Sequence, residues 1–336
     1  MKVVAAPDKF RGTATAAEAA RAIAAGARSA GWACRELPLA DGGEGTLDAL
    51  GGPNRTATVT GPLGDPVQAG WRLDGEVAVI ETARSSGLAL AGGMDGNDPM
   101  RASTRGAGEL LAAAIEAGAT TIVVGIGGSA TTDGGLGAIE ALGSVPFAER
   151  GVVVHVACDV RTTFVDAAAV FAPQKGASPE QVAALTERLR SLAADYRRTF
   201  GLDVTALTGS GGAGGLAGGL AALGARLEPG FDLVAGRVGL DEALAGADLV
   251  ITGEGLLDST SFDGKVVGSV LRRATDLGIG VAAIVGSHAA APVAHLQTVD
   301  LTERFGRARA FAETCACIEA AAAELLSHLS KVTLAP

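Results

Sequence analysis

Short apolar runs alternate along this chain with longer segments whose apolar residues recur at helical spacing. The run at residues 121–124 (TIVV) is β-branched and uncharged, which is typical of a buried strand in a parallel sheet. Similar runs predict further strands at residues 2–6, 34–39, 77–80, 152–157, 248–252 and 281–285. Helices are predicted between them, since Thr15 with Glu18 and Ser178 with Gln181 form capping boxes ahead of helical patterns. This alternation predicts an α/β fold.

The strand pattern changes between residues 56 and 80, where short strands are separated by Gly, Pro and Asp turn signals. A chain of 336 residues is long for one hydrophobic core, so two domains are expected. We predict a discontinuous Rossmann/flavodoxin-like domain with a mainly parallel sheet at residues 1–52 plus 240–336. Residues 53–239 would form a second α/β domain, with a mixed sheet, inserted into the first.

Composition narrows the environment and the partners of the protein. Aromatic residues make up 4% of the chain and glycines number 49, so the interior must consist mainly of Ala, Val, Leu and Ile. The net charge of −10 argues against nucleic acid or an anionic membrane surface as a partner. No run has the apolar content of a membrane span, no signal peptide is expected, and the four cysteines lack metal-binding spacing. These features predict a cytoplasmic protein.

Glycines gather directly after the apolar run at residues 121–124, in the segment GIGGSATTDGG. A glycine turn that follows a strand can point backbone N–H groups at an anion, so we expect Gly127, Gly128, Ser129 and Thr131 to bind phosphate. Asp133 could hold a cation beside it. The segment is also compatible with a plain tight turn, or with the dinucleotide fingerprint G-x-G-x-x-A. The fingerprint lacks its second strand with an acidic end about 20 residues later.

Polar residues also follow other predicted strands, where parallel topology would bring them to one edge of a sheet. These groups are Asp8 with Lys9 and Arg11, Asp41 with Glu44, Asp159 with Lys175, and Glu254 with Asp258 and Lys265. A third glycine run, residues 209–215, is interpreted as close helix packing, with a ligand cradle as the alternative. Carboxylates, cations and glycine loops suit phosphoryl transfer, although neither a P-loop nor the protein-kinase motifs are present. The residues alone therefore indicate a nucleotide-dependent transferase.

A series of segments, in order, resembles the motifs of the bacterial type I glycerate kinases. They are APDKFRGTATAAEAA, PLADGGEGT, STRGAGEL, IGGSATTDGGLGAIEALG, ACDV, FAPQKGAS and DLVITGEGLLD with GKV. The resemblance implies an α/β enzyme with one domain inserted in the other and an active site in the cleft between them. It implies a phosphotransferase that acts on an alcohol group, using ATP and Mg²⁺ to convert D-glycerate into phosphoglycerate. The product 2-phosphoglycerate is favoured, and 3-phosphoglycerate is the other option.

On this reading we assign roles to the polar groups as hypotheses. The metal candidates are Asp41, Asp133 and Asp159. The catalytic candidates are Lys175 and Lys265, which would neutralise transferred charge, and Asp8 or Asp258 as the base. Glycerate's carboxylate requires a fork-shaped cation, for which Arg11, Arg84 and Arg105 are candidates.

The chain departs from the family at a few positions, and two other functions stay open. Leu256 stands where relatives usually carry Arg, and the segments 143–152 and 159–171 are shorter than usual. The alternatives are an NAD-dependent dehydrogenase of a small hydroxy acid, which would use the GIGGSA turn, and a nucleotide-binding module without catalysis. The sequence does not decide the oligomeric state, for which a homodimer is considered.

Overall fold

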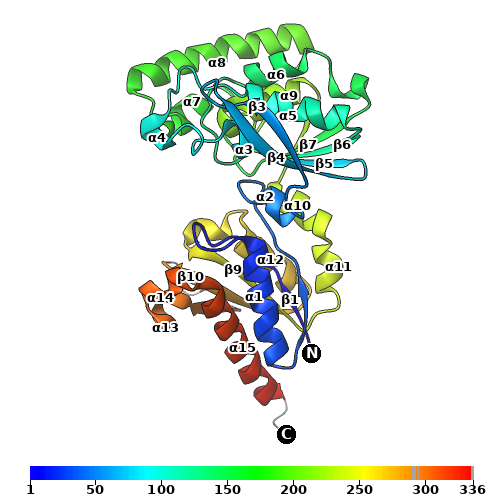
Figure 1. Ribbon diagram of the computed structural model, residues 1–336, viewed down its shortest axis with the longest axis vertical. Coiled ribbons are helices and arrows are strands. Elements are labelled where there is room, and N and C mark those ends of the chain that lie inside the picture. Colours follow the sequence, from blue (N-terminus) through cyan, green and yellow to red (C-terminus); the bar gives the residue numbers. More distant parts are fainter. Residues whose placement is uncertain (290–292, 294, 334–336) are drawn as a thin grey trace. The chain divides into compact units, whose positions relative to one another are not determined.

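The computed structural model describes residues 1–289, 293 and 295–333, and this part of the chain divides into two compact units. The terminal unit consists of residues 1–41, 48–50 and 231–336, and the central unit of residues 42–47 and 51–230. Figure 1 shows that each unit combines a sheet with helices. The α/β class predicted from the alternating pattern is confirmed.

The sheet of the terminal unit, which was predicted to be mainly parallel, is parallel throughout and has the strand order β11-β10-β9-β1-β2. Its strands are β1 (Lys2–Ala5), β2 (Ala33–Glu36), β9 (Leu249–Leu257), β10 (Gly280–His288) and β11 (Leu296–Asp300). The chain moves from β1 to β2 in one direction, and later from β9 through β10 to β11 in the other. The boundary between β1 and β9 is therefore a topological switch point, where α/β proteins commonly bind ligands.

Helices pack on both faces of this sheet, as in a doubly wound fold. On one face, Ile23 of α1 (Ala16–Ser29) and Ile318 of α15 (Thr314–Thr333) join a core with Ile251 and Ile284. On the other, α10 (Gly230–Val238), α11 (Leu240–Leu244) and α12 (Val266–Asp276) form a core with Val4 and Val250. The remaining elements are α2 (Thr46–Ala49), η5 (Ser259–Phe262), α13 (Leu301–Phe305) and α14 (Arg307–Ala312).

Two strands extend further than the sequence predicted, because glycines beyond the predicted strand ends still belong to the strands. β9 continues through Gly253 and Gly255 to Leu257, and β10 runs on to His288. A Cβ on Gly253 would lie 2.0 Å from the carbonyl oxygen of Ile284, and one on Gly286 would lie 2.4 Å from that of Gly255. These glycines therefore let the two strands approach each other closely while staying paired.

The central unit contains a mixed six-stranded sheet with the order β3-β4-β5-β6-β7-β8, which confirms the mixed sheet predicted for it. β3, β4 and β5 pair antiparallel, whereas β5 to β8 pair parallel. The strands are β3 (Arg55–Thr60), β4 (Pro66–Asp74), β5 (Val77–Glu81), β6 (Thr121–Gly125), β7 (Val153–Ala157) and β8 (Arg226–Glu228).

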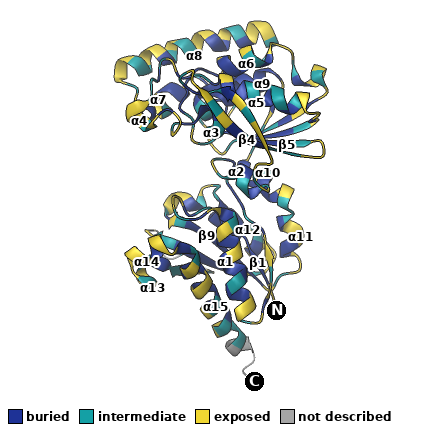
Figure 2. Cartoon of the chain, viewed as in Figure 1, coloured by how far each residue is buried: buried dark blue, intermediate teal, exposed yellow. Residues whose placement is uncertain are grey.

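The helices of the central unit enclose a core that includes Ile80, Leu110, Ile122, Phe164 and Leu189. In Figure 2 the outward side of α8 is exposed, whereas strand segments of both units are buried. The helices are α3 (Ala83–Ser86), α4 (Gly93–Gly96), α5 (Arg105–Glu116), α6 (Leu136–Leu142), α7 (Ala167–Phe171), α8 (Pro179–Phe200) and α9 (Leu216–Ala222). Short 3₁₀ turns occur at η1 (Phe147–Arg150), η2 (Pro173–Lys175), η3 (Val204–Ala206) and η4 (Gly212–Gly215).

Local sequence signals for helix starts and close packing are confirmed. Thr15 accepts the N–H of Glu18 and Glu18 accepts that of Thr15, and Ser178 and Gln181 do the same at the start of α8. Residues 209–215 pack closely, as interpreted, since a Cβ on Gly214 would lie 2.0 Å from the carbonyl oxygen of Thr131.

None of the helices in the described residues combines the length and the apolar character that crossing a membrane would need.

Candidate active site

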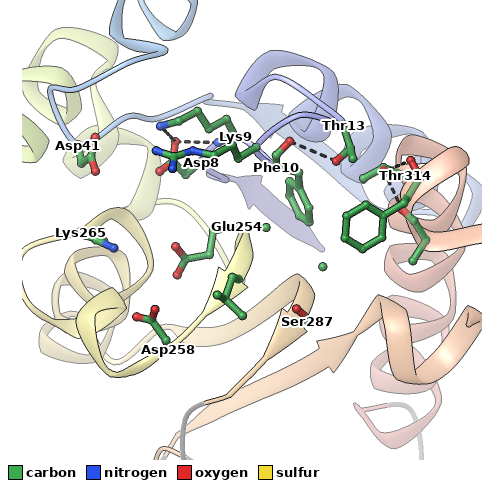
Figure 3. A pocket seen from close by; sticks show the side chains of 16 residues that line it. Asp8, Lys9, Phe10, Thr13, Asp41, Glu254, Asp258, Lys265, Ser287 and Thr314 are labelled. Atoms are coloured by element: carbon green, nitrogen blue, oxygen red, sulfur yellow. Dashed lines mark hydrogen bonds and ion pairs between the residues drawn. The ribbon is translucent and has the colours of Figure 1, made fainter. Parts of the chain in front are cut away.

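A pocket of about 460 Å³ opens at the carboxyl edge of the parallel sheet in the terminal unit. It is lined by residues that follow β1, residues near the ends of β9 and β10, and the residue that precedes α12 (Figure 3). This is the edge where β1 and β9 lie side by side at the switch point. The pocket therefore lies where the strand order favours ligand binding.

Five residues to which the sequence analysis assigned a role, from three separate loops, line this pocket. They are Asp8, Arg11, Asp41, Asp258 and Lys265. The sequence places them up to 257 positions apart, and parallel pairing of β1, β2 and β9 brings them to one edge. The grouping of these candidates at one place follows from the fold, and their individual roles stay predictions.

Asp8 is buried, with 7% of its surface exposed, directly after β1. Its Oδ1 accepts the N–H of Lys9 at 2.7 Å, and the Nζ atom of Lys9 lies 3.6 Å from the same oxygen. Burial raises the pKa of Asp8 to about 6; the charge of Asp41 adds to this rise and Lys9 opposes it. Asp8 therefore changes its protonation close to neutral pH.

Glu254 also lines the pocket, although the sequence assigned it no role beyond its loop. It lies within β9 and only 9% of its surface is exposed. Burial raises its pKa to about 7; the charges of Asp8 and Asp258 act in the same direction, while Ser261 and Lys265 act against it. In the sequence, the signal that could have identified Glu254 as a site residue is its place between two glycines near the end of a buried strand.

Asp258 and Lys265 are held by the turn that joins β9 to α12. Oδ1 of Asp258 accepts the N–H and the hydroxyl of Thr260, at 2.8 and 2.6 Å, and these bonds lower the pKa of Asp258. Lys265 donates to the Thr260 hydroxyl at 2.8 Å and is the N-cap residue of α12. Asp258 thus stabilises the turn, and Lys265 places a positive charge at a helix N-terminus.

The predicted glycine loop lies at the carboxyl edge of the central sheet, directly after β6. A Cβ on Gly127 would lie 2.6 Å from the backbone nitrogen of Glu44, so this glycine is required by close packing. Gly128 has a φ of +67°, and its carbonyl accepts the N–H of Leu88. The N–H of Ala130 donates to the carbonyl of Ser86. Part of the predicted cradle is therefore fixed by bonds within the protein.

Lys175 is buried beneath this loop, with 3% of its surface exposed. Its Nζ donates to the carbonyl of Thr131 at 2.5 Å, while the N–H of Thr131 donates to the hydroxyl of Ser129. Burial lowers the pKa of Lys175 to about 8, and the charge of Asp133 opposes that shift. The contacts of Lys175 indicate that it holds the glycine loop in place.

Asp133 is surrounded by hydrogen-bond donors. Its Oδ2 accepts the N–H and the hydroxyl of Thr104, both at 2.8 Å, and the N–H of Gly137 at 3.3 Å. Its Oδ1 accepts the N–H of Gly135 at 3.0 Å. A carboxylate with this many protein donors has few lone pairs for a metal ion, so its contacts favour a structural role.

Three other predicted residues of the central unit are near its sheet or its helices. Oδ1 of Asp159 accepts the N–H of Gly230 at 2.7 Å. Arg84 lies 3.9 Å from Oε1 of Glu81, a buried residue whose other oxygen accepts the N–H groups of Gly45 and Leu47. Arg105 pairs with Glu109 one turn along α5. Glu81 was missed by sequence reasoning; an acidic residue at the end of a buried strand was its only signal.

The predicted metal residues are divided between the units, with Asp41 in the terminal unit and Asp133 and Asp159 in the central unit. Within the described ranges, no cluster of three or more His, Cys, Asp or Glu residues is spaced to hold a metal ion. Mg²⁺ often uses only one or two carboxylates together with phosphate oxygens and water, so a site for it does not require such a cluster.

Comparisons with known proteins agree with the resemblance seen in the sequence. Residues 3–155 and 146–335 match the model of the glycerate kinase family. The chain is 39% identical over 305 residues to glycerate 2-kinase of Escherichia coli (strain K12), covering 79% of this chain and 80% of the relative. It is 40% identical over 326 residues to glycerate kinase of Bacillus subtilis (strain 168), covering 85% of each chain.

The fold comparison points the same way. A crystal structure of a protein provisionally assigned as glycerate kinase 2 from Salmonella typhimurium LT2 covers 100% of both chains, with a TM-score of 0.86 and 34% identity. These findings support neither the dehydrogenase nor the module without catalysis. Because the family model and these relatives match most of the chain, the protein is a kinase and belongs to the glycerate kinase family.

Proposed function

We propose that the protein transfers the γ-phosphoryl group of ATP to D-glycerate, with 2-phosphoglycerate as the favoured product. The observation that carries this proposal is the match to relatives named glycerate kinase, one of which is named for the 2-position. The pocket of the terminal unit supports it independently. Its volume of about 460 Å³ is within the range of small-molecule sites, and both carboxylates and cations line it.

The N-terminus of α12 gives this pocket an attraction for phosphate. Lys265 lines the pocket as the N-cap of α12, an 11-residue helix. Helix N-termini carry partial positive charge and unpaired N–H groups, which suit phosphate oxygens. Lys265 would therefore bind a phosphate group and neutralise charge that develops as the phosphoryl group moves.

The side chains that could bind a metal ion in this pocket suit Mg²⁺ better than a softer metal. The described residues that line the pocket include four carboxylates and neither Cys nor His. Oxygen ligands of this kind suit Mg²⁺, and we propose Asp41 as the residue that holds it. When bound, Mg²⁺ would neutralise phosphate charge.

Of the two base candidates from the sequence, Asp8 suits the task better than Asp258. The hydrogen bonds from Thr260 stabilise Asp258 as a charged group and lower its pKa, which weakens it as a proton acceptor. The pKa of Asp8, raised to about 6, is closer to neutral pH.

In the central unit, we propose that the N–H groups of Gly127, Gly128 and Ser129 bind phosphate oxygens. The N–H of Thr131 already donates to Ser129, so Thr131 would contribute by shaping the loop. Arg84 and Arg105 stay candidates for the glycerate carboxylate, as does Arg11 at the pocket of the terminal unit. A cytoplasmic location and a homodimer also stay predictions.

A coupled ADP-release assay with ATP and Mg²⁺ tests the function. We expect turnover with D-glycerate, weaker turnover with L-glycerate and lactate, and loss of activity on chelation that added Mg²⁺ restores. Phosphorus NMR of the product would show a phosphate on the 2-carbon, coupled to a single proton. A signal coupled to two protons would instead indicate 3-phosphoglycerate, and an absence of ADP release with D-glycerate would refute the proposal.

A further inference from the structure

Strand geometry directs the side chain of Glu254 into the pocket of the terminal unit. Side chains four positions apart on a strand lie on the same face, so Glu254 shares the face of Val250, which packs with Val266 and Val270 of α12. The start of α12 therefore lies beside the carboxylate. Figure 3 shows this carboxylate pointing into the space between Asp8, Asp258 and Lys265.

The two glycines beside Glu254 let neighbouring backbone segments pack closely against β9. A Cβ on Gly255 would lie 3.2 Å from the backbone nitrogen of Arg11, and one on Gly253 would lie 2.0 Å from the carbonyl oxygen of Ile284. The neighbouring backbones can therefore approach β9 closely, and only Glu254 contributes a polar side chain to this stretch of the strand.

One oxygen of Glu254 has no hydrogen-bond partner. Among buried side-chain atoms of the described residues, Oε1 of Glu254 is the only carboxylate oxygen in this state, and the other four atoms belong to Trp71, Ser86, Asn97 and Thr132. An unpaired buried polar atom destabilises the folded protein, and more strongly when the group is charged. A proton or a ligand that occupies Oε1 would remove this cost, so the arrangement suits a group that accepts a proton from substrate.

The other carboxylates of this pocket are more engaged. Asp8 uses Oδ1 for the N–H of Lys9 and pairs with its ammonium group, and Asp258 uses Oδ1 for Thr260. Asp41 also has interactions of its own. Among the described carboxylates that line this pocket, only Glu254 has an oxygen that is itself buried and has no hydrogen-bond partner.

We propose that Glu254, in place of Asp8, is the catalytic base, whose carboxylate accepts the proton of the attacking hydroxyl; this inference rests on the proposed function. As the hydroxyl oxygen bonds to the γ-phosphorus, the bond between that phosphorus and the β,γ-bridging oxygen breaks and ADP leaves with the electron pair. The proton moves to Glu254 and then to solvent when the product leaves. Asp8 acts as a positioning residue, because its negative charge increases the affinity of Glu254 for the proton.

The substitution Glu254→Gln tests this role, because it keeps the shape of the side chain and removes its basicity. We expect kcat to fall by about 10²-fold to 10⁴-fold, with KM for ATP and for D-glycerate within threefold of the starting protein. Glu254→Asp should retain part of the activity, since it keeps a carboxylate. Glu319→Gln, the same change at an exposed position of α15, is the control and should leave kcat unchanged.

The dependence of kcat on pH gives a second readout that a structural role would not change. The charged groups that face Glu254 are Asp8, Asp258 and Lys265, and together with burial they bring its pKa to about 7. Activity of the starting protein should therefore fall as pH decreases through about 7. Asp8→Asn should move this fall to lower pH, because it removes a negative neighbour, and Glu254→Gln should abolish it.

Three results would overturn the inference. The first is a kcat of Glu254→Gln within threefold of the starting protein. The second is recovery of its kcat at high Mg²⁺, which would make Glu254 a metal ligand. The third is loss of the acidic fall in Asp8→Asn while it persists in Glu254→Gln, which would make Asp8 the base. Failure of the starting protein to release ADP with D-glycerate would instead refute the proposed function.

Discussion

The carboxyl edges of the two sheets carry similar charged residues, but these residues differ in how many hydrogen bonds they form within the protein. At the central edge, Asp133 accepts hydrogen bonds from Thr104, Gly135 and Gly137, and Lys175 donates to Thr131. At the terminal edge, Glu254 is just as well buried, yet one of its oxygens has no partner. Charged groups at the first edge are bound by the protein, whereas the second edge leaves a charged group available to a ligand.

The number of hydrogen-bond partners within the protein distinguishes structural carboxylates from functional ones better than residue type or burial does. A carboxylate saturated by protein donors fixes the loops that supply those donors, so its removal should act mainly on folding. A buried carboxylate with an unclaimed oxygen destabilises the protein, so its retention calls for a functional reason. Substitutions at the two edges should therefore have opposite effects on stability.

The largest effect is expected at the central edge, from Asp133→Ala. The change leaves the N–H groups of Thr104, Gly135 and Gly137 without an acceptor and removes the carboxylate nearest to buried Lys175. We expect the free energy of unfolding to fall by roughly 3–5 kcal/mol. Urea denaturation followed by circular dichroism would measure it.

Asp65→Ala, at an exposed turn of the same unit, is the matched control and should change stability by less than about 0.5 kcal/mol. If Asp133→Ala instead abolished turnover with little loss of stability, the contrast between the edges would fail. That result would favour the hypothesis from the sequence that Asp133 is a metal ligand.

The sequence was sufficient for the features that depend on local pattern. Capping boxes located α1 and α8, and apolar runs located the strands that position the loops. The rule that parallel strands share an edge was enough to expect Asp8, Asp258 and Lys265 to lie together, and they line one pocket.

The sequence could not show which polar side chains form their hydrogen bonds with other residues of the protein. The donors to Asp133 include Thr104, 29 positions away, and Lys175 meets Thr131 across 44 positions. Gly253 resembled a loop residue because the reason for it, the close approach of Ile284 in β10, depends on a strand that is distant in the sequence. Hydrogen-bond saturation is a tertiary property, so the sequence could not show that protein donors surround Asp133 while one oxygen of Glu254 has no partner.

At the terminal edge, Glu254→Gln is expected to increase the free energy of unfolding, by an amount smaller than the decrease expected for Asp133→Ala. The folded-state pKa of about 7 lies above the ordinary value of 4.5, so the protonated group stabilises the fold below pH 4.5. That contribution is lost as pH rises through about 7, and at pH 8.5 the starting protein contains a buried charge. The variant does not, and its relative stability should therefore increase between pH 5 and pH 8.5 by about 2 kcal/mol.

Urea denaturation of both proteins at the two pH values would measure this difference. The comparison within each pH removes the contribution of the other ionisable groups, apart from those coupled to Glu254. Equal stability differences at pH 5 and pH 8.5 would mean that Glu254 is solvated in the folded protein, and the contrast between the edges would lose its main support.

The smallest effect, on KM, concerns Leu256, which lines the same pocket and for which the sequence resemblance predicts an Arg in relatives. Its side chain is 51% exposed, so Leu256→Arg can project a guanidinium group into solvent without disturbing the core. An exposed positive charge at a site for anions strengthens binding only modestly and is screened by salt. We expect KM for D-glycerate or ATP to fall by about twofold to fivefold at 20 mM salt, and to return toward the starting value at 300 mM.

Leu277→Arg gives a matched control, because Leu277 is 52% exposed and caps the C-terminal end of α12, whereas the pocket adjoins its N-terminal end. A general effect of one added positive charge would lower KM equally in both variants. A specific effect at the pocket would appear only in Leu256→Arg. The substrate whose KM responds would also identify which anion lies beside residue 256, since a guanidinium group acts most strongly on the nearest carboxylate or phosphate.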